Sequence, residues 1–256
     1  MESPSTSPTG DGGERPRPSR RGWIIGGIIV VVLLVATLVP ALLFGDGDDG
    51  LDFSRPGVTP EDVLKEAKEN LDDTEGVEIA LTSQGLTDDV STALVSAQGT
   101  AVRPDRFSGA FALRAFSLPV DVDIVATEGT TYARAALLGP GWREVDPKQY
   151  NAPDPGTLLD PDSGVSGILT ATQDPVEDGE ERCGEATATR YTGTVPAETV
   201  RNIIPGADGD FDAAYLIDSD GFLCRADLTG EFYPEVSLTY EIGFSNYGET
   251  IEITAP

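Results

Sequence analysis

The 256-residue sequence contains no histidine, and this absence removes several common kinds of active site. Histidine is the base of Ser-His-Asp and Cys-His catalysis and a frequent zinc ligand, so neither kind of centre is expected. A G-x-S-x-G elbow, a Walker loop and a G-x-G-x-x-G fingerprint are also missing. The sequence therefore predicts a protein that is not an enzyme, with no cofactor, no catalytic residues and no metal site.

Basic residues are scarce as well, with 17 Lys and Arg against 44 Asp and Glu and a formal net charge of −27. Residues 1–44 hold four arginines and three acidic residues, so the acidity belongs to the remainder of the chain. Nucleic-acid binders need clustered Lys and Arg to neutralise phosphates, so a nucleic-acid partner is excluded. A solvated, soluble exterior is the simplest interpretation of the charge.

One long apolar run, residues 23–44, contains no charged side chain. At about 1.5 Å per residue it reaches roughly 33 Å, which is enough to cross the hydrocarbon core of a bilayer. Arginines precede the run and aspartates follow it, which predicts a cytoplasmic N-terminus and an extracytoplasmic main domain. A cleaved signal peptide is the alternative, because small residues occur around Val39 and Ala41, although such apolar regions are usually only ~7–15 residues long.

The regions on either side of this run differ in composition. Residues 1–22, dominated by Pro, Ser, Gly and Arg, are predicted to be a disordered cytoplasmic tail. Residues 45–58 are predicted to form an acidic flexible tether. Residues 59–256 are long enough for an extracytoplasmic domain with a sizeable core. The expected location is thus the plasma membrane, crossed once, with residues 23–44 as the membrane contact.

Cys183 and Cys224 are the only cysteines, and both lie in the exported part. An oxidising compartment favours a disulfide between them over two buried thiols. Closing a loop of about 40 residues would stabilise the fold by roughly 4 kcal/mol in the chain-entropy model.

The exported part begins with a helix signal, since Thr59 suits the N-cap, Pro60 the first helical position and Asp62 a capping box. Alternating apolar and polar runs separated by short turns then predict antiparallel meanders. The expected fold is α+β with a mainly antiparallel sheet. Strands are predicted at 77–81, 92–102, 107–116, 120–125, 131–138, 187–195, 211–217, 221–232, 236–244 and 250–254, with short helices at 165–169 and 196–204.

Small residues recur along one register of the predicted strands from Ala93 to Ala101, and again at Gly109 and Ala115. A row of small residues either leaves room for a guest molecule or lets a helix pack closely against the sheet. These residues alone favour neither interpretation.

Several stretches also occur in the order typical of one family. They are VLKEAKENLDDTEGVEIALTSQG, SAQGTAVRPDRFSGAFAL, VDIVATEGTTYARAALLGPGWREVD, YNAPDPGTLLDPDSGVSGIL, YTGTVPAETVRNIIPGA and AYLIDSDGFLCRADLTG. Through them the chain, from about Thr59 to Thr254, resembles the LppX/LprAFG family of actinobacterial cell-envelope lipoproteins.

The resemblance implies a strongly curved antiparallel sheet that forms a half-barrel, with helices across its concave face and an apolar cavity between them. Family members bind acylated lipids or glycolipids and are implicated in moving them through the cell envelope. It also gives the segment from Gly139 to Ser163 a role at the cavity mouth. The candidate lining residues are Val95, Ala97, Gly99, Phe107, Gly109, Phe111 and Ile124.

One departure from the family bears on function. Family lipoproteins carry a lipidated cysteine just after the signal segment, and no cysteine stands directly after Phe44 here. The anchor is therefore expected to be a transmembrane helix, and a tethered domain is better suited to binding lipid than to carrying it away. A membrane transporter is a candidate partner for lipid transfer. The competing hypothesis is a structural or interaction ectodomain whose concave face is filled by its own side chains.

Overall fold

The computed structural model describes residues 57–88, 90–150, 152–184, 186–204 and 206–256. The predicted cytoplasmic tail, the predicted membrane span at 23–44 and nearly all of the predicted tether lie outside these residues. Within the described ranges, no helix combines the length and apolar character that a membrane crossing needs.

Helix α1, Pro60–Asp73, begins as the sequence predicts. The Asp62 backbone N–H donates to the Thr59 hydroxyl, and the Thr59 backbone N–H donates to the Asp62 carboxylate, which completes the capping box. The hydrogen bonds that the Thr59 backbone N–H and then the Thr59 hydroxyl donate to the Asp62 carboxylate lower the pKa of this carboxyl. The helix buries one apolar face, made of Leu64, Ala67 and Leu71, against the sheet.

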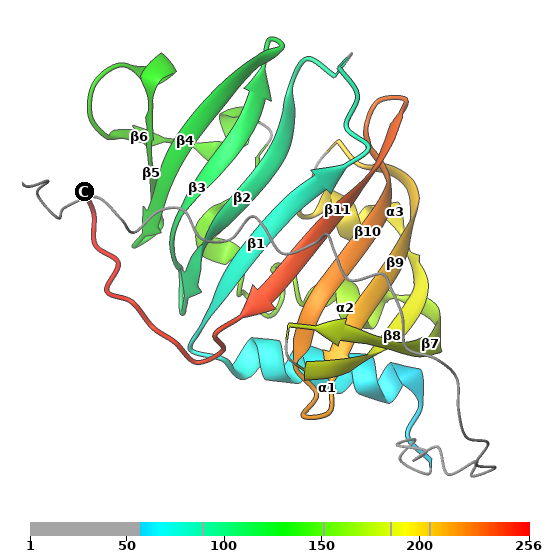
Figure 1. Cartoon of the computed structure of the whole chain (residues 1–256). Helices are drawn as coiled ribbons and strands as arrows, with labels where there is room; N and C mark the ends of the chain where they lie inside the picture. Colours follow the sequence, from blue (N-terminus) through cyan, green and yellow to red (C-terminus); the bar gives the residue numbers. More distant parts are fainter. Residues whose placement is uncertain (1–56, 89, 151, 185, 205) are drawn as a thin grey trace, which may run out of the picture. The chain divides into compact units, whose positions relative to one another are not determined.

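The strands form one antiparallel sheet in the order β6-β5-β4-β3-β2-β1-β11-β10-β9-β8-β7 (Figure 1). Two meanders join where β1 pairs with β11, so the first and last strands of the chain lie side by side. The edge strands β6 and β7 do not pair, and the sheet stays open. The strands are β1 Gly76–Gln84, β2 Ala93–Val102, β3 Arg106–Ala115, β4 Leu118–Thr127, β5 Thr130–Ala135, β6 Arg143–Val145, β7 Gln173–Cys183, β8 Ala186–Val195, β9 Asp208–Asp218, β10 Leu223–Tyr233 and β11 Val236–Ser245.

The remaining helices are short and lie with α1 on one side of the sheet (Figure 1). Apolar residues of α1, α2 and α3 share one core with the strands. The mainly antiparallel α+β fold with helices on one face is thus confirmed. These helices are η1 Ala136–Leu138, η2 Pro147–Tyr150, η3 Pro155–Thr157, α2 Gly167–Ala171 and α3 Ala197–Arg201.

One strand prediction was wrong, and two strands, β6 and β7, were missed. Residues 250–254 form no strand; Ile253 instead packs on Val102 and Val125 on the opposite side of the sheet from the helices. Strand β6 has only three residues and lies in a segment rich in Pro and Gly. Strand β7 was missed because its sequence, QDPVEDGEERC, is mostly charged and contains a proline, which is typical of a sheet edge.

The predicted disulfide between Cys183 and Cys224 is confirmed, with an S–S distance of 2.05 Å. It ties the end of β7 to β10, which is three strands away in the sheet order. Glu181 strengthens the same connection, because its carboxylate accepts hydrogen bonds from Arg190 of β8 and Arg225 of β10.

Candidate functional site

The side of the sheet that faces the helices, called the inner face below, carries the candidate site. Nearest α1 lies a covered row of four residues on consecutive strands: Val77, Ala101, Phe107 and Ala126. All four are at most 2% exposed and belong to the core that α1 closes. This end of the inner face is therefore sealed by the helices.

A second row lies farther from α1, and its burial differs. Ile242, Leu81, Ala97, Phe111 and Val122 are paired in turn across β11, β1, β2, β3 and β4. Each of these residues is only half-buried, although all point to the same side as the core. This open row is a continuous apolar strip, five strands wide, that the helices cover incompletely.

Between the two rows, a glycine pair receives an aromatic ring. Gly99 and Gly109 are paired, and a β-carbon on either would lie 2.5 Å or 2.7 Å from Cζ of Phe107. The Phe107 ring therefore lies across both glycines and reaches toward Phe111, with 5.7 Å between the ring centroids. The small residues thus seat a side chain of the sheet itself, rather than a guest molecule or a helix, as the competing hypothesis of a self-filled concave face supposes.

The structure brings six of the seven predicted lining residues together on the inner face. Phe107 belongs to the covered row, and Ala97 and Phe111 belong to the open row. The other three, Gly99, Gly109 and Ile124, lie between these rows.

Val95 is the exception, because it lies in a register shift of β2 between Leu94 and Ser96. Leu81 and Ile242 of the open row were missed, because their place depends on the pairing of β1 with β11. Strand alternation could have found Val122, which is two residues before Ile124 on the same strand.

Hydroxyl groups tie down the backbone at the rim of the sheet next to the open row. The Tyr233 hydroxyl accepts from the Leu94 backbone N–H, and the Tyr240 hydroxyl donates to the Leu94 carbonyl. Burial, and after it the neighbouring Tyr233, raise the pKa of Tyr240, so its hydroxyl stays a hydrogen-bond donor at any physiological pH. The irregular part of β2 is held in one position as a result.

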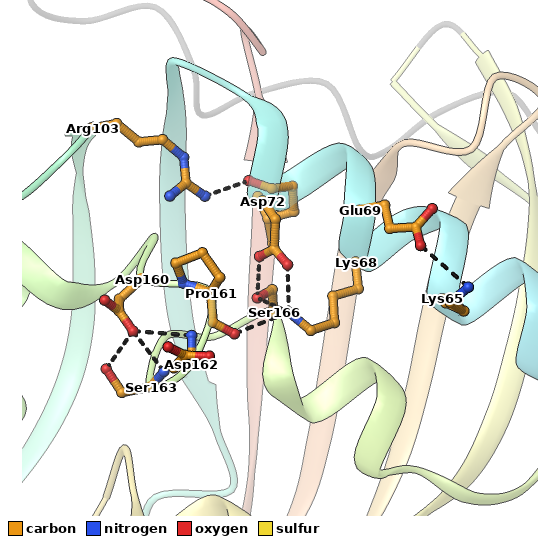
Figure 2. Close-up of polar contacts among 11 residues, drawn as sticks. Lys65, Lys68, Glu69, Asp72, Arg103, Asp160, Pro161, Asp162, Ser163 and Ser166 are labelled. Carbon is orange, nitrogen blue, oxygen red and sulfur yellow. Dashed lines mark hydrogen bonds and ion pairs between the residues drawn. The ribbon is translucent and has the colours of Figure 1, made fainter.

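The opposite end is locked by polar contacts between α1 and the segment before α2 (Figure 2). The Lys68 ammonium pairs with Asp72 and donates to the Pro161 carbonyl, at 3.0 Å. The Ser166 hydroxyl donates to the Asp72 carboxylate at 2.6 Å, and the Arg103 guanidinium donates to the Leu71 carbonyl at 3.3 Å. These contacts hold the helical cover over the covered row.

The segment predicted for the cavity mouth, Gly139–Ser163, is divided between the two ends. It starts directly after η1, at the rim beside the open row, but η3 lies at the α1 end. There the Thr131 hydroxyl donates to Asp154, and a β-carbon on Gly156 would lie 2.8 Å from the Asp105 carbonyl oxygen. Most of this segment therefore belongs to the cover rather than to the rim.

Two surface pockets lie away from the predicted lining residues. One, of about 330 Å³, is at the rim beside Val90, Tyr233 and Val236. The other, of about 460 Å³, is a polar groove lined by threonines and aspartates of β7 to β11. Burial raises the pKa of Asp227 in this groove, against the lowering influence of Arg225.

Across the part of the chain that the structure describes, no group of three or more acidic or cysteine side chains is placed to hold a metal.

Comparisons with known proteins agree with this architecture. The model of the LppX_LprAFG lipoprotein family matches residues 59–253. Lipoarabinomannan carrier protein LprG of Mycolicibacterium smegmatis is 29% identical over 203 residues, which cover 76% of this chain and 81% of the relative. The LprG protein of Mycobacterium tuberculosis H37Rv is 25% identical over 233 residues, covering 90% and 94% of the two chains.

Two solved structures share the fold. The crystal structure of LprF from Mycobacterium bovis superimposes with a TM-score of 0.65 at 19% identity, covering 77% of this chain and 96% of that one. Lipoprotein LppX of Mycobacterium tuberculosis gives a TM-score of 0.57 at 17% identity, covering 78% and 100%. From the extent of the family match, the chain belongs to the LppX_LprAFG lipoprotein family.

Proposed function

We propose that this protein binds an acylated lipid or glycolipid on its inner face, with an acyl chain lying along the open row, and that it acts as a binding protein rather than an enzyme. The observation that carries the proposal is the half-buried apolar strip from Ile242 to Val122. Apolar side chains aligned on five strands beside a closed core are a surface that a further apolar group can cover. The two LprG relatives are named lipoarabinomannan carrier proteins, and these names support the same ligand class.

The energetics favour such a ligand. Each acyl methylene removed from water contributes about 0.8 kcal/mol, so a chain lying across several strands needs few polar contacts for affinity. The Phe107 ring of the covered row lies beside the Phe111 ring of the open row, so the strip is continuous with the aromatic part of the core. A site of this kind selects for chain length and apolar character more than for one headgroup.

We further propose that residues 23–44 anchor the protein in the plasma membrane, with residues 1–22 in the cytoplasm and residues 45–58 as a tether. The lipid-binding domain, residues 59–256, then lies on the extracytoplasmic side of the cell envelope. Assistance in lipid transfer across the envelope, with a membrane transporter as partner, is the extension of this role.

The proposal is tested by photo-crosslinking in the full-length chain. We expect p-benzoylphenylalanine in place of Phe111 to form a lipid adduct on irradiation in an actinobacterial envelope, detected by mass spectrometry of the purified protein. The matched control replaces Tyr132, an aromatic residue packed on the opposite side of the sheet with Val102 and Val125. Equal adducts at both positions, or none at Phe111, would overturn the proposal.

The second candidate is an interaction ectodomain that binds no lipid. The observation in its favour is the Phe107 ring, which already occupies the space above Gly99 and Gly109. This candidate predicts that the Phe111 position crosslinks to a protein, or only within its own chain, while the amount of lipid attached stays at the level of the Tyr132 control.

A further inference from the structure

Three strongly exposed apolar side chains lie at the rim of the sheet that is remote from α1. Phe116 is 84% exposed, Leu118 is 64% exposed and Leu137 is 71% exposed. Phe116 belongs to the turn from β3 to β4, Leu118 is the first residue of β4, and Leu137 belongs to η1 directly after β5. Because these strands are antiparallel neighbours, both segments lie at the same end of the sheet, and Figure 1 shows them at the edge opposite α1.

The backbone at this turn makes the choice of phenylalanine unusual. Phe116 and Ser117 link β3 to β4 with φ angles of 52° and 64°, in the left-handed region that favours glycine or asparagine. A turn of the same length at the other end, Glu128 and Gly129 between β4 and β5, has φ angles of 52° and 70° and a polar residue with glycine. Phe116 thus has an unfavourable backbone conformation, and burial of its side chain does not offset this cost, because the side chain is almost fully exposed.

The exposed turn is nevertheless held in place. The Ser117 backbone N–H donates to the Ser91 carbonyl at 2.9 Å. The Arg114 guanidinium donates to the carbonyls of Thr87 and Val90, at 2.6 Å and 3.2 Å. These bonds brace the β3–β4 turn against the loop between β1 and β2. The exposed Phe116 side chain is therefore attached to a backbone that hydrogen bonds hold in place.

We propose that this rim, defined by Phe116, Leu118 and Leu137, inserts into the surface of a lipid bilayer. The three side chains project from a turn, from the first residue of a strand and from a short 3₁₀-helix. Separately protruding apolar side chains suit a bilayer, which accepts them without a shaped groove. Arg114 lies in β3 directly before the turn. Its guanidinium already donates to the two carbonyls, and its Nη2 lies 3.6 Å from Oδ1 of Asp88. Attachment to anionic headgroups contributes little here, so insertion is apolar and insensitive to salt.

The position of the rim suggests a role in lipid entry, and this role rests on the function proposed above. The rim and the open row lie at the same end of the inner face, since β3 runs from Phe111 to the turn at Phe116 and β4 runs from Leu118 to Val122. An acyl chain leaving a bilayer touched by the rim would reach the open row without crossing water. The rim is thus the entry point of the lipid.

The test uses the full-length chain in phosphatidylcholine nanodiscs, with an environment-sensitive NBD label on Ser117→Cys. The control carries the same label on Glu128→Cys, in the matching turn at the α1 end. The native cysteines are bonded to each other, so the introduced thiol is the one that reacts. We expect a blue shift, and quenching by brominated acyl chains, at position 117 and neither at position 128. Raising the ionic strength to about 1 M, where the Debye length is about 3 Å, leaves the result unchanged.

A triple variant, Phe116→Ser, Leu118→Ser and Leu137→Ser, abolishes the shift and the quenching while the melting temperature changes little, because these side chains are mostly exposed. The proposal is overturned if position 117 gives no shift, if both positions respond equally, or if a shift needs envelope proteins in addition to lipid. The crosslink at Phe111 separates the two proposals. A lipid adduct with an unshifted rim leaves the binding function standing, and an inserted rim without an adduct leaves only the membrane contact.

Discussion

The Phe107 ring lies directly against the backbone of Gly99, at the place where any larger residue would need its β-carbon. We expect Gly99→Ala to destabilise the domain by about 1–3 kcal/mol, because overpacking forces the ring or the strand to move. Adding Phe107→Leu should recover part of this loss. Urea denaturation followed by circular dichroism measures both effects.

Gly243→Ala in β11 is the control for this substitution, because the nearest atom to its added β-carbon is the Ala80 carbonyl oxygen at 3.8 Å, an ordinary contact. If Gly99→Ala costs no more than Gly243→Ala, the ring is not fixed above the glycine pair.

The open row can be filled without touching the opposite side of the sheet. Ala97→Phe places a ring on the strip between Leu81 and Phe111, and we expect it to reduce lipid affinity at least tenfold, about 1.4 kcal/mol. Ala110→Phe, on the neighbouring strand but the other face, should leave binding intact. The amount of lipid extracted per mole of purified protein reports the difference. Equal lipid content in the two variants would count against the open row as the site.

The contact between α1 and Ser166 should matter more than the charge pairs on the helix surface. Ser166→Ala removes a buried donor to the Asp72 carboxylate, and we expect a cost of about 1 kcal/mol. Lys65→Ala removes an exposed pair with Glu69, which is worth only about 0.3–0.5 kcal/mol in helices. Denaturant midpoints of the two variants, compared with the unchanged protein, test the ranking. A Ser166→Ala loss no larger than that of Lys65→Ala contradicts it.

The acid stability of the domain should depend on Asp160. The hydroxyl and then the backbone N–H of Ser163 donate to this carboxylate and lower its pKa. A carboxyl whose pKa is lower in the folded state stabilises the fold above its unfolded pKa, about 3.9, and this contribution is lost as the pH falls through the folded pKa. Asp160→Asn should therefore lose less stability than the unchanged protein between about pH 5 and about pH 2.

Melting temperatures across this range provide the measurement. Ser163→Ala should flatten the same part of the curve in part, because it removes the hydroxyl donor and leaves both the carboxyl and the backbone N–H donor. An unaltered pH dependence in both variants would show that the hydrogen bonds at Asp160 do not shift its titration.

Local signals in the sequence were sufficient for much of the fold. The start of α1 follows from Thr59, Pro60 and Asp62, whose side chains act within four residues. The meanders follow from alternation and short turns, since each strand pairs with its neighbour in the chain. Strand β7 was not predicted because an edge strand with many charged residues lacks the apolar alternation that identifies a strand.

The candidate site was predictable only in part. Period-two alternation puts Gly99, Gly109 and Phe111 on one face without any knowledge of the fold. Which of these positions stays open depends on where α1 and η3 cover the sheet, and that follows from packing between distant segments. The extension of the open row to Ile242 depends on a strand pair between the two ends of the domain, for which no local signal exists.

The pairing of β1 with β11 has a consequence for how the domain acquires its structure. Each meander contains contacts between neighbours in sequence, so each can form early, but the ladder joining them needs the last strand to be synthesised. Until then β1 and β10 present unpaired edges, which are templates for association with other chains. A polypeptide that ends before Val236 would keep both edges exposed. The final strand therefore decides when this domain stops being prone to aggregation.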